Sequence, residues 1–228
     1  MDGLPLSQRA PRPFCCVIIP AFNEARRVGA VARLAVRCGL FAEVVVVDDG
    51  STDGTADAAR VTGARVLTHG RNRGKAQAML TGVKSSASPV VCFLDADLLG
   101  VTDEHLVALV EPVVSGEVPA ALGVFSGGRT ATSLAQRIAP MISGQRCLRR
   151  ELLDGFTEWN SGFGVETALN DHLLRLGVQQ RLVRWEGAAQ AMKEEKRGLV
   201  VGFLARLKMY GEIVVTWAKT KARPGRRM

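Results

Sequence analysis

The sequence of 228 residues contains no long apolar run, and aromatic residues make up only 5% of it. No stretch reaches the ~20 apolar residues that a membrane-spanning helix needs. No signal peptide is recognisable, because Glu24, Arg26 and Arg27 closely follow the short apolar run 14–22. Hydrophobic residues still reach 47%, which is enough for one globular domain with a core of Val, Leu, Ala and Ile.

Cysteine is also scarce. The five cysteines are odd in number and show no metal-ligand spacing. Cys15, Cys16 and Cys92 lie inside apolar runs that are typical of strands. We therefore expect buried, reduced thiols and a cytoplasmic protein, whose basic end could make it peripheral at the inner face of the membrane.

The net charge of +8 is concentrated at the C-terminal end, where residues 193–228 hold ten Lys or Arg and three Glu. Apolar residues recur at helical spacing over 199–218, with charged residues between them. This pattern predicts an amphipathic helix and basic tail over 199–228. Such a tail could bind an anionic membrane surface or nucleic acid, or it could simply be solvated.

Strand and helix patterns alternate in the first hundred residues, as expected for an α/β fold. Continuous apolar runs predict strands buried on both faces at 14–20, 43–47 and 89–94, and 65–68 is expected to be a further short strand. Helical patterns lie between them, one from an Asn23 cap to about Cys38 and one at 74–85. Repeated units of this kind predict a mostly parallel sheet flanked by helices.

The rest of the chain is less regular. We expect a strand at 120–125, a helix at 165–176 and a strand at 180–185. Residues 1–12 show no periodicity and are expected to be a flexible leader. Residues 13–198 would then form one domain.

Polar clusters follow three of the predicted strands, at 20–24, 48–53 and 95–97. Ligands of parallel sheets bind beyond the carboxyl ends of the strands, so the clusters predict one shared site. Asp95 and Asp97 could together hold Mg²⁺, which takes one or two carboxylates plus substrate phosphates and water. An aspartate pair at a strand end can also be only a turn or a helix cap.

Asp48 and Asp49 could accept hydrogen bonds from ribose hydroxyls or from a base N–H. The alternative is a turn at Asp49-Gly50 followed by a helix cap at Ser51, Thr52 or Asp53. Both interpretations can hold for different residues of this segment.

Four segments resemble the family 2 glycosyltransferases of the GT-A, Rossmann-like fold. In order and spacing these are VIIPAFNE (17–24), VVVVDDGSTDGT (44–55), RNRGKAQA (71–78) and CFLDADL (92–98). The resemblance implies a metal-dependent glycosyltransferase that uses Mg²⁺ or Mn²⁺ and a UDP- or GDP-sugar. It assigns nucleotide-sugar binding to Pro20, Phe22, Glu24, Asp48, Asp49, Asn72, Gly74, Lys75 and Asp95. Lys75 could instead be a solvated lysine at a helix start.

The same resemblance implies that Asp95 and Asp97 bind the metal, with Asp97 as the more direct ligand. In some relatives a histidine completes the metal shell, but residues 187–196 contain none. Gln190 is the candidate in its place. The three histidines, His69, His105 and His172, are expected to be structural or solvated.

Two later segments carry a weaker resemblance. Residues 143–146 are similar to the S-G-x-R segment of polyprenol-phosphate glycosyltransferases, which makes Arg146 a candidate ligand of an acceptor phosphate. Residues 162–166 resemble a segment of those enzymes and of glucosyl-3-phosphoglycerate synthases in which an acidic residue faces the acceptor. Glu166, with Asp171 second, is thus the candidate base for a hydroxyl acceptor, whereas an ionised phosphate needs none.

The expected activity is inverting transfer of a hexosyl group, preferably to polyprenyl phosphate at the cytosolic membrane face. The alternative is a soluble acceptor such as phosphoglycerate, with retention of configuration as a further possibility. A nucleotidyltransferase usually carries a Gly-rich loop after its first strand, where this chain has 20–24 instead. A nucleic-acid-binding module would spread basic residues and aromatics over a face, so no nucleic acid partner is expected.

Overall fold

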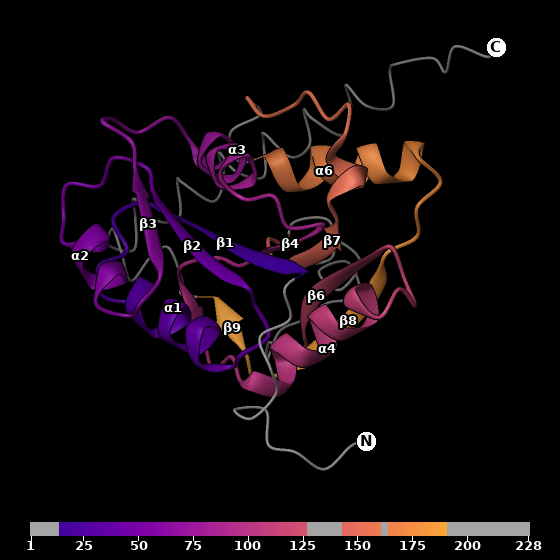
Figure 1. Cartoon of the computed structure of the whole chain (residues 1–228), viewed down its shortest axis with the longest axis horizontal. Coiled ribbons are helices and arrows are strands. Elements are labelled where there is room, and N and C mark those ends of the chain that lie inside the picture. The colour runs from indigo at the N-terminus through magenta and orange to yellow at the C-terminus, as the bar shows by residue number, and fades with distance from the viewer. Residues whose placement is uncertain (1–13, 127–142, 161–163, 191–228) are drawn as a thin grey trace.

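The computed structural model describes residues 14–126, 143–160 and 164–190. A seven-stranded sheet in the order β3-β2-β1-β4-β7-β6-β8 runs through the middle of the molecule (Figure 1). Its strands are β1 (Cys15–Ala21), β2 (Glu43–Asp48), β3 (Arg65–Thr68), β4 (Val90–Phe93), β6 (Ala120–Ser126), β7 (Arg146–Arg149) and β8 (Arg181–Glu186). Strands β3, β2, β1 and β4 are parallel, which confirms the expected α/β fold with a mostly parallel sheet.

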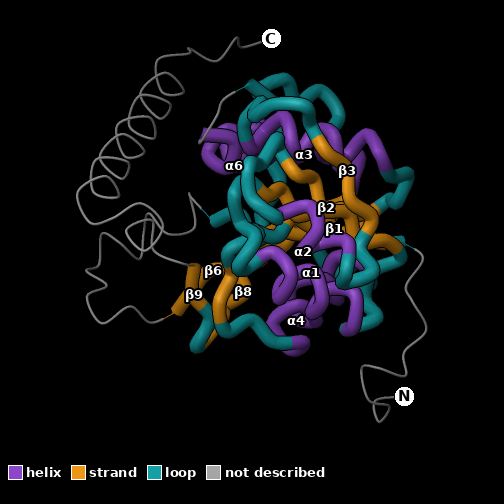
Figure 2. Tube along the Cα trace, turned by 90° about the vertical axis from the view of Figure 1, so that its left-hand side faces the viewer, coloured by secondary structure: helices purple, strands orange, loops and turns teal. Residues whose placement is uncertain are grey.

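Helices cover both faces of the sheet. They are α1 (Val28–Arg37), α2 (Thr55–Arg60), α3 (Lys75–Ser85), α4 (Asp103–Val114) and α6 (Val165–Arg175), with a 3₁₀ turn at Arg150–Leu153. Helices α3 and α6 lie on one face, and α1, α2 and α4 lie on the other (Figures 1 and 2). Every residue of β1 is buried, and alternate residues face the two cores, as the continuous apolar run predicts.

Strand β7 is inserted antiparallel between β4 and β6, and it was not expected from the sequence. Because it runs against β4, its first residue, Arg146, lies opposite Phe93 at the end of β4. Segment 143–145, which precedes Arg146, therefore arrives at the edge where β4 ends. A separate two-stranded ladder pairs β5 (Leu98–Leu99) with β9 (Ala189–Gln190), and Leu98 lies opposite Gln190.

The start of α1 differs from the expected one. Helix α1 begins at Val28, and its N-cap is Arg27 with no side-chain cap hydrogen bond. Asn23 instead adopts a positive φ of 54°, and its side-chain oxygen accepts a hydrogen bond from the backbone N–H of Thr52 at 2.9 Å. The Asn23 side chain therefore bonds to the β2–α2 loop and does not cap α1, because the Thr52 N–H lies within reach.

The five cysteines are free and buried, as expected for reduced thiols. The predicted leader at 1–12 and the predicted helix and tail at 199–228 lie outside the described residues.

Candidate active site

The loops after β1 and β2 are held together at the carboxyl edge of the sheet. The backbone N–H of Asn23 donates to Ser51 Oγ at 2.9 Å, and that of Glu24 donates to Thr55 Oγ1 at 2.8 Å. These bonds place the 20–24 cluster beside the 48–53 cluster, so the two predicted polar clusters do share one edge. Within them Pro20 is buried and Phe22 is 37% exposed.

Asp48 and Asp49 are both buried carboxylates at the end of β2. Asp48 Oδ1 accepts the backbone N–H of Ser51 at 3.1 Å. Asp49 accepts the N–H of Arg73 at 3.0 Å and that of Gly74 at 2.7 Å. Asp49 therefore determines where the loop before α3 lies. Its direct contact with a nucleotide remains a prediction.

The imidazole ring of His69 bridges Asp49 and Thr81. Its Nδ1 lies 2.6 Å from Asp49 Oδ1, and its Nε2 lies 2.9 Å from Thr81 Oγ1. An ionised carboxylate can only accept, so Nδ1 carries a proton. A Cβ at Gly50 would stand 2.4 Å from the Arg71 carbonyl carbon, and φ there is +73°, so this turn requires glycine. The other two histidines also have partners inside the fold: His105 stacks on Trp185, and His172 contacts the Leu152 carbonyl oxygen.

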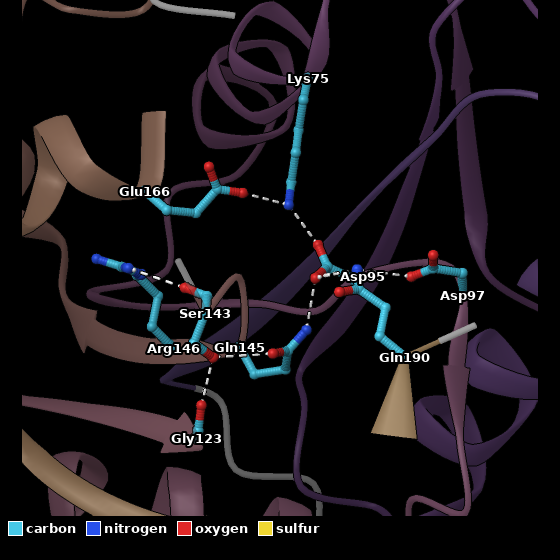
Figure 3. Close-up of polar contacts among 9 residues, drawn as sticks. All are labelled: Lys75, Asp95, Asp97, Gly123, Ser143, Gln145, Arg146, Glu166 and Gln190. Atoms are coloured by element: carbon cyan, nitrogen blue, oxygen red, sulfur yellow. Dashed lines mark hydrogen bonds and ion pairs between the residues drawn. The ribbon is translucent and has the colours of Figure 1, made fainter. Parts of the chain in front are cut away.

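The loop that Asp49 holds includes Asn72, which is exposed, and ends at Gly74, whose φ is +93°. Lys75 is the first residue of α3 and points across the carboxyl edge (Figure 3). Its Nζ donates to Asp95 Oδ1, beyond β4, and to Glu166 Oε1, in the first turn of α6. Three elements thus converge on one ammonium group.

The charge state of Lys75 follows from these partners. Burial by itself would lower the pKa of Lys75, but the carboxylates of Asp95 and Glu166 outweigh burial and raise the pKa above its ordinary value. Lys75 is therefore a cation at neutral pH. It serves as the counter-charge of two carboxylates that are only 6% and 8% exposed.

The second oxygen of Asp95 faces two amides. Asp95 Oδ2 accepts from Gln145 Nε2 at 2.6 Å and from Gln190 Nε2 at 3.0 Å (Figure 3). Gln190 Nε2 also donates to Asp97 Oδ1 at 3.0 Å. The structure thus brings Asp95, Asp97 and Gln190 together, and the pairing of β9 with β5 is what delivers Gln190.

Asp95, Asp97 and Gln190 fit a divalent cation whose remaining ligands would be substrate phosphates. Two carboxylates converge on the amide nitrogen of Gln190, a positively polarised group placed between them. Rotating that amide would turn its oxygen, a hard ligand, toward the same position. No group of three or more His, Cys, Asp or Glu side chains within 14–126, 143–160 and 164–190 could hold a metal ion. Mg²⁺ commonly makes do with one or two carboxylates, phosphates and water.

Arg146 lies behind this cluster and is 1% exposed. Its two terminal nitrogens donate to Asn170 Oδ1 at 3.1 Å and to the Ser143 carbonyl oxygen at 3.0 Å. Burial lowers its pKa to about 10, against the opposing effect of Glu166 and Asp95, so Arg146 stays charged at neutral pH. In this arrangement an acceptor phosphate would reach the guanidinium only after local movement. Phosphate binding by Arg146 therefore remains a prediction.

The two candidate bases on α6 have different surroundings. Glu166 is buried in the cluster and bonded to Lys75. Asp171 pairs instead with Arg175, four residues further along the helix, at 2.8 Å. The geometry therefore favours Glu166 over Asp171 as the acidic residue of this site, and neither catalytic role is tested by these contacts.

A family model described as Glycosyl transferase family 2 matches residues 16–174. The 4,4'-diaponeurosporenoate glycosyltransferase of Staphylococcus aureus (strain USA300) is 38% identical over 87 residues, which is 36% of this chain and 23% of that enzyme. The enzyme of the same name from strain MRSA252 is 34% identical over 99 residues, which is 41% of this chain and 26% of that enzyme. The match thus spans about a quarter of the length of these relatives.

Two solved structures of glucosyl-3-phosphoglycerate synthase from Mycobacterium tuberculosis share the fold over 93% of this chain and 81% of theirs. The one in complex with Mn²⁺, UDP and glucosyl-3-phosphoglycerate has a TM-score of 0.73 and 26% identity. The one in complex with Mg²⁺ and UDP has a TM-score of 0.72 and 26% identity. The family match runs from β1 to α6 and includes Lys75, Asp95 and Glu166. Because of this match and its GT-A fold, the chain belongs to glycosyl transferase family 2.

Proposed function

We propose that this chain transfers a hexosyl group from a UDP- or GDP-sugar to a phosphate-bearing acceptor, with Mg²⁺ or Mn²⁺ as cofactor. The observation that carries the proposal is the convergence of Asp95, Asp97 and Gln190 beside the Lys75 ammonium at the carboxyl edge of the parallel strands. The solved neighbours, which were crystallised with UDP and Mn²⁺ or Mg²⁺, support the choice of donor and metal.

The donor diphosphate would lie between Lys75 and the Asp95–Asp97 pair. Asp97 and Asp95 would hold the cation, with the Gln190 side-chain oxygen in place of the histidine of some relatives. When bound, the cation supplies positive charge that stabilises the leaving nucleoside diphosphate. Lys75, which starts α3 beside the Asp49-held loop, would add a second positive charge to that leaving group.

The charges of the site agree with an anionic donor that brings its own cation. Asp95, Asp97 and Glu166 contribute three carboxylates, and Lys75 and Arg146 contribute two cations. A diphosphate alone would be repelled by this net negative site. A metal–diphosphate complex would not be, because the cation offsets the phosphate charge. Cation and nucleotide are therefore expected to bind with mutual dependence.

For the acceptor we propose polyprenyl phosphate, which the S-G-x-R resemblance at 143–146 favours, used at the inner membrane face. Within the described ranges no helix is both long and apolar enough to cross a bilayer. Glu166 would face the acceptor. Attack by an already ionised phosphate needs no base, which suits a Glu166 that is engaged with Lys75.

The second candidate acceptor is a soluble phosphate such as phosphoglycerate. It is favoured by the structural likeness to a synthase that was crystallised with glucosyl-3-phosphoglycerate. Both acceptors carry an anionic phosphate, and they differ in whether a lipid surface is needed.

The test measures release of nucleoside diphosphate by the purified chain. UDP- and GDP-hexoses would be offered with Mn²⁺ or Mg²⁺ and with either polyprenyl phosphate in detergent or phosphoglycerate. We expect one donor to turn over with one acceptor, and Asp97→Ala to lose at least ~100-fold in turnover, as expected on loss of a metal ligand. Asp57→Ala, in an exposed ion pair on α2, is the matched control. Turnover that survives chelation and Asp97→Ala would refute the metal role.

A further inference from the structure

Gln145 is a buried polar residue in contact with the Asp95 carboxylate. Its side chain is 0% exposed, and its Nε2 donates to Asp95 Oδ2 at 2.6 Å. Its Oε1 lies 2.9 Å from the hydroxyl of Ser143, which also donates to the Gly123 carbonyl oxygen on β6 (Figure 3). A line of contacts therefore runs from the backbone of β6, through Ser143 and Gln145, to Asp95.

The amide of Gln145 has one favourable orientation. The ionised Asp95 carboxylate can only accept, so the NH₂ group must face it. A flipped amide would set its oxygen against the carboxylate, and neither of these two oxygens carries a proton to share. Ser143 carries one hydroxyl proton for two acceptors, Gly123 O and Gln145 Oε1.

The backbone next to Gln145 confines Asp95 as well. A Cβ at Gly144 would stand 2.5 Å from both carboxylate oxygens of Asp95, closer than any side chain tolerates. The backbone at Gly144 thus lies directly against the carboxylate. Asp95 Oδ1 faces Lys75, and Asp95 Oδ2 faces Gln145 and Gln190.

We propose that Gln145 is a positioning residue that orients Asp95 for the cation and the donor diphosphate. The inference rests on the proposed function. A fully buried amide costs free energy unless it is hydrogen-bonded, so an apolar residue would suit a site concerned with packing alone. The donor of Gln145 is directed instead at a single oxygen of a predicted metal ligand. Such supporting partners typically change metal affinity or activity by roughly 10–100-fold.

The test uses the full chain with Gln145→Met, which keeps the length of the side chain and removes the donor. The measurement is Mn²⁺ affinity by electron paramagnetic resonance, in the presence of UDP and, in a second arm, of GDP. We expect Gln145→Met to weaken Mn²⁺ binding by roughly 10–100-fold. We also expect kcat to fall by more than KM for the nucleotide sugar rises. Ser143→Ala should act in the same direction and more weakly.

Thr62→Val is the matched control, because it also removes a buried side-chain hydrogen bond, at 2.6 Å to the Ala59 carbonyl oxygen, but in the turn that follows α2. Its Mn²⁺ affinity should equal that of the unmodified chain even where its thermal stability falls. The positioning role is overturned if Gln145→Met binds Mn²⁺ normally or if Thr62→Val loses as much. If the unmodified chain fails to bind Mn²⁺ both in the presence of UDP and in the presence of GDP, the proposed function itself is overturned.

Discussion

At the scale of single residues, Lys75 carries most of the electrostatic balance of the site. It contacts Asp95 and Glu166, which come from elements separated by tens of residues, and both are buried. Without a counter-charge, two buried carboxylates this close would destabilise each other. Lys75 thus supplies one cation inside the site, and a bound metal–diphosphate complex would add a second.

Lys75→Met should therefore separate metal binding from donor binding. Removing the ammonium leaves Asp95 and Glu166 uncompensated, so Mn²⁺ affinity without nucleotide should rise by about tenfold or more, which corresponds to ~1.4 kcal/mol. Turnover should fall, because the diphosphate loses a cationic partner. The measurement is Mn²⁺ titration followed by electron paramagnetic resonance.

Lys84→Met is the control, since Lys84 lies on the same helix and is exposed. It should change neither quantity. An unchanged Mn²⁺ affinity in Lys75→Met would show that Lys75 and the cation do not compete for the same carboxylates.

At the scale of elements, the close packing of α3 on β1 positions Lys75. A Cβ at Gly82 would lie 2.3 Å from Ile18 Cγ2, so α3 approaches the sheet more closely than a larger residue would allow. The position of α3 also depends on its first turn, which Asp49 holds through Gly74. The glycine inside the helix is explained by this contact rather than by a turn.

Gly82→Ala should destabilise the protein by about 1–3 kcal/mol, because the added methyl group overpacks a close-packed contact. Thermal and urea unfolding would measure the loss. Gly54→Ala is the control, because its Cβ would meet nothing within 4 Å. Equal stability of Gly82→Ala and the unmodified chain would mean that α3 can move away from β1 at little cost.

The buried thiols predict how stability depends on pH. Burial raises the pKa of Cys38 to about 11, from an ordinary value of 9.0 in the unfolded chain. Between pH 9 and 11 the unfolded chain therefore loses this proton while the folded chain keeps it. The Cys38 contribution to stability is complete below pH 9 and is lost as pH rises toward 11.

Two measurements check this. The free energy of unfolding should fall from pH 9 to 11 less steeply in Cys38→Ala than in the unmodified chain. Iodoacetamide at pH 8 should modify the five buried cysteines slowly in the folded protein and rapidly in denaturant. Rapid modification of the folded chain would contradict their burial.

At the scale of the whole molecule, one edge of the sheet collects residues from far apart in the sequence. The β1, β2 and β4 ends supply the 20–24, 48–49 and 95–97 clusters, and parallel pairing brings them together. The antiparallel β7 and the β5–β9 ladder supply 143–146 and Gln190. Most of the net positive charge of the chain lies in another part of the sequence, at residues 193–228.

Deleting residues 199–228 should weaken sedimentation of the chain with anionic vesicles by at least ~10-fold, because each basic residue near such a surface contributes ~1 kcal/mol. Vesicles of neutral lipid serve as the control and should bind little of either protein. Donor hydrolysis by the shortened chain should persist. Undiminished binding to anionic vesicles would exclude the tail as the membrane contact.

The sequence by itself determined the strands of residues 14–94, their parallel arrangement and the grouping of the Asp48–Asp49 and Asp95–Asp97 clusters at one edge. These features follow from local apolar runs and from the rule that parallel strands end on the same side. The helix at α3 and the strand at β3 were likewise predictable from local pattern alone.

Only the tertiary structure decided the rest of the site. Gln145 stands at the variable position of a four-residue segment, and its meaning appears only when antiparallel pairing of β7 sets it against Asp95, fifty residues earlier. Glu166 meets Lys75 across 91 residues, and Gln190 meets Asp95 across 95. Such contacts come from strand pairing and burial at long range, which no local periodicity encodes.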